Sequence, residues 1–263
     1  MSRQNYYVGR KRRRRREVDA DLVAELVKVE RRSQPRLGTR KLKRLLKGAL
    51  AEAGVEIGRD RMFDELKQRD LLVKKLPRQQ PRTTQSRHTL RVMRNEIKGR
   101  VFLKPNEVWM ADLTYLRTAE GYLYASLITD KVSRKIVGYH VGESLESIGC
   151  VQALEMALAD LPEGCRPIHH SDRGSQYCCH EYIGRLEARA LSISMTETDH
   201  CAENALAERV NGILKGEYHL GGEFLTKESA RLAVDQAIYC YNHKRPHTAL
   251  GYEFPAVVHR QAA

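Results

Sequence analysis

Three carboxylates stand where strands and a helix could aim them at one point. Asp112 lies inside the apolar, β-rich run VWMADLTYL, Asp172 follows the short run PIHH, and Glu208 lies midway through a helical pattern. Thirty-five residues lie between Asp172 and Glu208. Acids drawn from two strand-like segments and one helix indicate a shared site rather than three separate surface charges.

Such a set of acids suits phosphodiester chemistry. Two divalent ions about 4 Å apart activate an attacking oxygen and stabilise the leaving oxygen. Mg²⁺ takes oxygen ligands and usually needs only one or two carboxylates per ion. We therefore expect two Mg²⁺ ions, with Mn²⁺ able to substitute, held by Asp112, Asp172 and Glu208.

Each acid also has an ordinary interpretation. Asp112 could be a strand-edge residue with an ion-pair partner, Asp172 a turn residue, and Glu208 a helix surface residue. Other acids nearby compete for the same role, and we expect none of them to be catalytic: Asp130, Asp160, Asp199 and Glu203.

Charge is distributed unevenly along the chain. The 263 residues include 46 Lys and Arg against 33 Asp and Glu, a formal net charge of +13. Residues 1–100 carry a net charge of +18 and residues 101–263 a net charge of −5. A basic front half and a slightly acidic back half indicate a DNA-binding part followed by a catalytic part, although charge alone would also fit an RNA-binding protein.

The six cysteines do not indicate a metal site or disulfides. No C-x-x-C pair occurs, and the adjacent Cys178 and Cys179 lack the histidine spacing of a zinc site. Unpaired thiols suit a reducing cytoplasm. Without a long apolar segment or signal-peptide pattern, we expect a soluble cytoplasmic protein, associated with the nucleoid and not with a membrane.

The front half is expected to hold a disordered basic tail (1–17), a helix-turn-helix-like DNA-binding domain (18–76) and a basic linker (77–100). Apolar periodicity predicts helices over 18–32, 40–53 and 59–69, the third being our candidate for the DNA groove. A small helical bundle whose charges only confer solubility is the alternative. The candidate DNA contacts are Arg12, Arg13, Arg14, Arg40, Lys43, Arg44, Arg59, Arg61 and Lys67.

Residues 101–263 are expected to form the catalytic core with a C-terminal helix. The pattern predicts strands over 108–116, 121–130, 135–141 and 191–195, a short run over 167–170, and helices over 147–158, 180–190, 203–215 and 229–241. This order is typical of a ribonuclease-H-like α/β domain with a mixed five-stranded sheet. Here it is preceded by a small all-α helix-turn-helix-like domain.

Four motifs in order carry a resemblance: W-x-x-D-L-T-Y, H-S-D-R-G-S-Q-Y, E-N-A-L-A-E-R-x-N-G-x-L-K and Y-N-x-x-R-P-H-x-A-L-G-Y. They resemble the integrase-core transposases of bacterial insertion sequences and, more distantly, retroviral integrases. In the chain, Ala202 stands where the family often has an aromatic residue.

The resemblance implies a DNA transposase that cuts element ends and joins the 3′-hydroxyl to another strand, with terminal inverted repeats and target DNA as partners. It also implies a homo-oligomer and an upstream helix-turn-helix protein, as partner or fusion. Asn204 and Lys215 share a helix face with Glu208, so we expect them at the DNA. Arg245-Pro246-His247 matches the family's C-terminal motif, but a plain helix end explains it equally well.

Two other functions fit parts of the pattern. A ribonuclease-H-like nuclease would hydrolyse without strand transfer and would use a fourth carboxylate, for which Glu155 is available. A DNA-binding regulator would have a catalytically inactive core. The basic front half and the spacing of the last two acids favour the transposase.

Overall fold

The computed structural model describes residues 3–74, 90–197 and 203–261. The chain divides into two compact units, Met1–Pro77 and Arg78–Ala263. Within the described residues, no helix has the length and apolar character needed to cross a membrane.

The first unit contains four helices: α1 (Arg3–Glu30), α2 (Thr39–Leu45), α3 (Lys47–Glu52) and α4 (Arg59–Gln68). Helix α1 takes in residues 3–17, for which the charge block led us to expect disorder. Arginine is a good helix former and no proline interrupts the segment, so the helix continues through the block. The helix expected over 40–53 is divided in two at Leu46.

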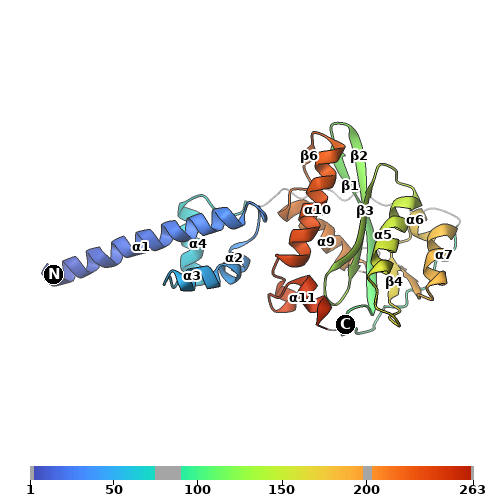
Figure 1. Ribbon diagram of the computed structural model, residues 1–263, viewed down its shortest axis with the longest axis horizontal. Coiled ribbons are helices and arrows are strands. Elements are labelled where there is room, and N and C mark those ends of the chain that lie inside the picture. The colour runs from blue at the N-terminus through green and yellow to red at the C-terminus, as the bar shows by residue number, and fades with distance from the viewer. Residues whose placement is uncertain (1–2, 75–89, 198–202, 262–263) are drawn as a thin grey trace. The chain divides into compact units, whose positions relative to one another are not determined.

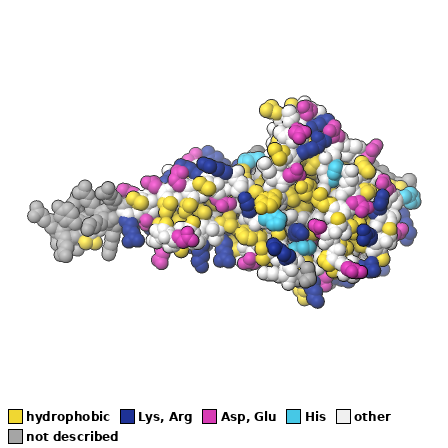
Figure 2. All heavy atoms as spheres, in the orientation of Figure 1, with side chains coloured by type: hydrophobic (Ala, Val, Ile, Leu, Met, Phe, Trp, Pro, Cys, Tyr) yellow, Lys and Arg dark blue, Asp and Glu magenta, His cyan; other side chains and the backbone are white. Residues whose placement is uncertain are grey.

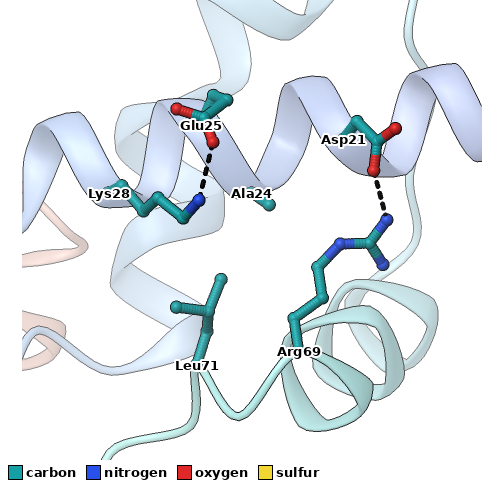
Figure 3. Close-up of a pocket in the computed structure, with 6 residues that line it drawn as sticks. All are labelled: Asp21, Ala24, Glu25, Lys28, Arg69 and Leu71. Carbon is teal, nitrogen blue, oxygen red and sulfur yellow. Dashed lines mark hydrogen bonds and ion pairs between the residues drawn. The ribbon is translucent and has the colours of Figure 1, made fainter.

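The helical unit has a hydrophobic core of its own. Leu42, Leu46 and Leu50 recur at intervals of four and are buried against α1 and α4. The basic side chains of α2 and α3 therefore face outward. Arg69, just after α4, reaches back across a small pocket to Asp21 of α1, with 2.6 Å between the charged atoms (Figure 3).

The second unit is built on a mixed sheet of five strands in the order β3-β2-β1-β4-β5, and β6 extends it beside the end of β1. The five-stranded expectation is confirmed. Strand β1 is antiparallel to β2 and parallel to β4, and β4 is parallel to β5. The strands are β1 (Val108–Thr118), β2 (Gly121–Asp130), β3 (Ile136–Gly142), β4 (Ile168–Ser171), β5 (Ile193–Met195) and β6 (Glu223–Phe224).

Helices cover both faces of this sheet (Figure 1). One core lies between the sheet and helices α5 (Ser147–Ala159), α6 (Ser175–Cys178) and α7 (His180–Ala188). The other lies between the sheet and α9 (Ala205–Glu217) and α10 (Lys227–His243). A 3-10 turn (Thr248–Leu250) and α11 (Pro255–Arg260) follow.

Both outer strands of the sheet are covered. The side chain of Asn242 donates to the carbonyl of Ile136 and accepts from its amide, both at 2.9 Å, on β3. Residues 90–97 lie along β5, where the Met195 amide donates to the Arg94 carbonyl (3.4 Å) and the Glu96 amide to Ser194 Oγ (2.8 Å). Of the linker expected over 77–100, residues 77–89 lie outside the described part. Residues 90–97 pack on the rest of the catalytic unit.

Candidate active site

Asp112 occupies the middle of β1, on the face that α9 covers. Met110 and Leu116, two and four residues away on the same face, are buried in apolar clusters on that side of the sheet. An acid at this position is only partly exposed. Partial burial of a carboxylate costs stability unless a cation or hydrogen bonds meet it.

Asp172 comes directly after β4, the parallel neighbour of β1. Met110 pairs with His170 in the register, so two residues further on Asp112 and Asp172 come side by side. Neighbouring strands lie about 4.8 Å apart. The Gly174 amide donates to Asp172 Oδ1 at 3.0 Å, and a Cβ on Gly174 would stand 3.1 Å from that same oxygen, which favours glycine here.

Helix α9 is fastened to β1 by two asparagines seven residues apart. Asn204 Nδ2 donates to the Ala111 carbonyl at 3.2 Å, and Asn211 Nδ2 donates to Asp112 Oδ2 at 2.6 Å. Glu208 lies four residues after the first and three before the second, so it shares their helix face. Its side chain is exposed. Asn211 was not among the residues expected from the sequence, although its helical spacing from Glu208 was a usable signal.

The acids influence one another electrostatically. Burial, followed by the negative charge of Asp172 and to a lesser degree that of Glu208, raises the pKa of Asp112 to about 7. Hydrogen bonds from Asn211 and from the Leu113 amide oppose this rise. The negative charges of Asp172 and Glu208 therefore both reach Asp112.

Lys215 stands two helical turns beyond Glu208. Its Nζ lies 4.4 Å from the centre of the Tyr115 ring, and burial lowers its pKa while the charge of Asp112 raises it. A lysine in this position balances part of the negative charge.

Some features of the acids favour a divalent cation, and one does not. A cation between Asp112 and Asp172 would relieve the repulsion that raises the pKa of Asp112. The Oδ1 atoms of Asn204 and Asn211 are buried without a hydrogen-bond partner, so the neighbourhood keeps unused oxygen acceptors. Among the described residues, however, no three His, Cys, Asp or Glu side chains are arranged as a ready metal site. The described acids are thus not assembled into a ready metal site, and Glu208 is the exposed member of the three.

The competing acids have structural surroundings. Asp130 is fully buried and accepts hydrogen bonds from the Asn106 amide and from the amide and hydroxyl of Ser133, each at 2.7 Å. Glu203 accepts from the Glu197 amide and lies 3.7 Å from Lys98. Asp160 caps the end of α5, and Asp199, like Ala202, lies outside the described residues.

Glu155, which the nuclease alternative would need, lies on α5 and points to α7. It forms an exposed ion pair with Arg185 at 3.2 Å. Its charge is not among those that shift the pKa of Asp112. The geometry therefore does not make it a fourth member of the acid group.

The residues around Asp172 hold the fold together. His170 Nδ1 lies 2.8 Å from Ser194 Oγ on β5, and Gln176 Nε2 donates to the Leu145 carbonyl at 2.9 Å. Arg173 Nε donates to the Thr196 carbonyl at 2.6 Å. These contacts fix the turn that carries Asp172.

The C-terminal motif is also structural. Arg245 is 2% exposed and forms a two-pronged pair with Glu217 at the end of α9, at 2.8 and 2.7 Å. Its Nη1 lies 3.0 Å from His247 Nε2. The motif thus clamps the segment after α10 onto the helix that bears Glu208.

The expected DNA contacts have mixed surroundings. Asn204 is 2% exposed and donates to the Ala111 carbonyl of β1, so its side chain is buried in this conformation, and its contact with DNA stays a prediction. In the helical unit, Arg40, Arg44, Arg59 and Lys67 are exposed, and Lys43 and Arg61 are partly buried. The side chains of Arg12, Arg13 and Arg14 lie outside the described residues.

Comparisons with known proteins agree with this geometry. Two models described as integrase core domain match residues 103–201 and 189–255. A Shigella sonnei protein described as an insertion element IS600 uncharacterized 31 kDa protein is 36% identical, over 97% of this chain and 94% of its own length. The chain belongs to the integrase-core transposase family of bacterial insertion sequences.

Further relatives of this integrase-core transposase carry more explicit names. The transposase for IS629 of Shigella sonnei is 35% identical over 66% of this chain, and transposase InsF for IS3fB of Escherichia coli K12 is 36% identical over 56%. The matches cover 59% and 51% of those two proteins, so the chain spans little more than half of their length.

A solved structure, a simian T-cell lymphotropic virus intasome in complex with a PP2A regulatory subunit, matches 92% of this chain and 74% of its own, with a TM-score of 0.51 at 18% identity. This likeness concerns the fold. The ribonuclease-H-like core expected from the order of elements is confirmed.

Proposed function

We propose that this integrase-core transposase cuts DNA at the ends of an insertion element and joins the freed 3′-hydroxyl to another strand. The observation that carries the proposal is the position of Asp112 on β1 and of Asp172 directly after β4, the parallel neighbour of β1, beside a helix fastened to Asp112 itself. Family membership and the transposase names of its relatives support the same reaction.

The family depends on divalent metal, and we assign Asp112, Asp172 and Glu208 as the residues that would hold two Mg²⁺ ions, with Mn²⁺ able to substitute. When bound, such ions would activate the attacking oxygen and stabilise the leaving one. The third carboxylate, Glu208, is exposed and free to turn toward the pair.

The protein's own groups keep the acids in place. Asn211 and the Leu113 amide each donate to one oxygen of Asp112, and the Gly174 amide donates to Asp172. Each carboxylate therefore has a fixed orientation and retains lone pairs for a cation. Lys215, beside Asp112, is positioned to attract a neighbouring phosphate.

The partners follow from this chemistry. We propose terminal inverted repeats and target DNA as substrates, a homo-oligomer because two ends are joined in one event, and a helix-turn-helix protein encoded upstream as partner or fusion. The basic first unit supplies attraction for the polyanion. The protein would act in the cytoplasm, at the nucleoid.

A strand-transfer assay on a labelled element end with Mg²⁺ tests the proposal. Joined product is expected from the wild type and none from Asp112→Asn, Asp172→Asn or Glu208→Gln, because each swap keeps size and removes a ligand charge. DNA binding should survive in all three. Glu155→Gln is the control and should keep activity.

The outcomes separate the alternatives. Cutting without joining would identify a nuclease. A retarded but uncut end in the wild type would identify a DNA-binding regulator. Full activity in any of the three acid variants would remove that residue from the site.

A further inference from the structure

Helix α4 is electrically balanced, although the sequence favoured it for the DNA groove. It carries three basic and three acidic residues. Arg59 pairs with Asp60 at 2.7 Å and Arg61 lies 3.8 Å from Glu65. The exposed Asp60 and Asp64 would face the phosphates of any DNA that approached this helix.

Arg69, immediately beyond α4, already forms ion pairs within the helical unit. Its guanidinium pairs with Asp21 of α1 at 2.6 Å and with Glu65 at 2.9 Å, across the pocket shown in Figure 3. It points toward α1. Charges of both signs are interspersed over the face of the helical unit visible in Figure 2. Because the charges of α4 balance, this helix provides little long-range attraction for a polyanion.

Helices α2 and α3, in contrast, have a strongly basic surface. No acidic residue occurs between Thr39 and Ala51, whereas five basic residues do. Arg40, Arg44 and Lys47 are exposed and recur at intervals of four and three, which places them on one face. The other face carries the buried leucines of the core.

The backbone keeps this stripe continuous across the junction of the two helices. The Leu46 amide donates to the Leu42 carbonyl and the Leu50 amide to the Leu46 carbonyl, both at 2.9 Å. The seven steps from Arg40 to Lys47 therefore span about 10 Å. That length meets the phosphates of more than one nucleotide, because successive phosphates of a strand rise about 3.4 Å along the duplex axis.

We propose that the stripe formed by Arg40, Arg44 and Lys47 binds the phosphate backbone of duplex DNA, and that α4 does not enter the groove. This rests on the proposed function, since DNA is the partner. Contacts to phosphate position a protein without reading sequence. The unit thus grips DNA of any sequence.

Salt dependence of binding by the full chain tests the proposal. Anisotropy of a labelled random-sequence duplex is followed between about 50 and 200 mM salt, without Mg²⁺. Each phosphate contact contributes about 0.9 to the slope of log K against log salt. The triple variant Arg40→Gln/Arg44→Gln/Lys47→Gln should lower the slope by roughly two to three.

The matched control removes the same charge from α4, as Arg59→Gln/Arg61→Gln/Lys67→Gln. In this control the slope of log K against log salt should fall by less than about 0.9, the contribution of one phosphate contact. The proposal is overturned if the slope falls equally in the two triple variants, or falls more in the α4 variant. It is also overturned if the slope does not fall in the variant of Arg40, Arg44 and Lys47. Unlabelled duplex RNA that competed better than duplex DNA would overturn the choice of partner.

A circular dichroism melt shows whether both triples fold; all six side chains lie outside the buried core, so wild-type melting is expected. If the first triple does not fold, single substitutions at Arg40 and Lys47 replace it, each expected to lower the slope by about 0.9. Because no Mg²⁺ is present, failure of the strand-transfer chemistry would leave this measurement unchanged.

Discussion

Asn211 is the residue that ties the helix bearing Glu208 to the catalytic strand. It donates to Asp112 Oδ2 at 2.6 Å and is itself buried. Its hydrogen bond lowers the pKa of Asp112 against the effect of burial and of Asp172. Loss of this donor should therefore raise the pKa of Asp112 and weaken its hold on a cation.

Asn211→Ala should need about tenfold to a hundredfold more Mg²⁺ for half-maximal strand transfer, the effect expected when a partner of a metal ligand is removed. A Mg²⁺ titration of joined product measures this. Gly212→Ala is the control, since a Cβ there meets nothing within 4 Å. An unchanged Mg²⁺ requirement in Asn211→Ala would show that the hydrogen bond does not matter to the site.

At the scale of single residues, the acid in an unusual position could be recognised from the sequence, whereas the ordinary residues that orient it could not. Asp112 was recognisable because an acid interrupts an apolar strand, and the structure sets Asp172 beside it. Asn211 and the amide of Gly174 gave no comparable signal, because asparagines and glycines serve many purposes and their partners lie far away in the sequence. Asn204 showed the same ambiguity: its helix face was inferred, but not what that face contacts.

The end of α9 depends on one ion pair. Arg245 and Glu217 meet with side chains 3% and 23% exposed, and they join the helix to the segment after α10. Arg245→Ala would remove the guanidinium that pairs with the carboxylate of Glu217. We expect a loss of about 3 kcal/mol in the free energy of unfolding, the lower end for a broken buried pair because Glu217 still meets water.

Urea denaturation of the variant measures this loss. The exposed pair of Arg185 and Glu155 is the comparison, and Arg185→Ala should cost no more than about 1 kcal/mol. Equal costs in the two variants would mean that the C-terminal motif does not hold α9.

Secondary structure was largely predictable where apolar periodicity was strong. Strand β2 begins and ends at the expected residues, and α5, α7 and α9 lie within two residues of the expected limits. The pattern failed where the outcome depends on tertiary contacts. Residues 90–97 were expected to belong to a linker, but Leu90, Met93 and Ile97 pack against hydrophobic clusters, and the segment forms hydrogen bonds to β5 and its flanks. The two-residue β6 is likewise set by pairing with β1.

The described residues of the two units share no hydrophobic cluster. Leu42, fully buried, belongs to the core of the helical unit, and Leu154, equally buried, belongs to that of the catalytic unit. The units should therefore unfold separately.

Calorimetry of the full chain should show two transitions. Leu42→Ala should destabilise the helical unit by about 2 to 5 kcal/mol and shift only its transition. Leu154→Ala is the counterpart and should shift only the other. A single transition displaced by both variants would contradict the independence of the units.

The cover that residues 90–97 give to β5 determines where the chain can be shortened. A fragment beginning at Val101 would leave the outer backbone groups of β5 bare, and bare strand edges recruit other molecules. Such a truncation should aggregate on purification, whereas a fragment beginning at Leu90 should elute as a defined species in size-exclusion chromatography. A well-behaved fragment from Val101 would show that this segment is dispensable for solubility.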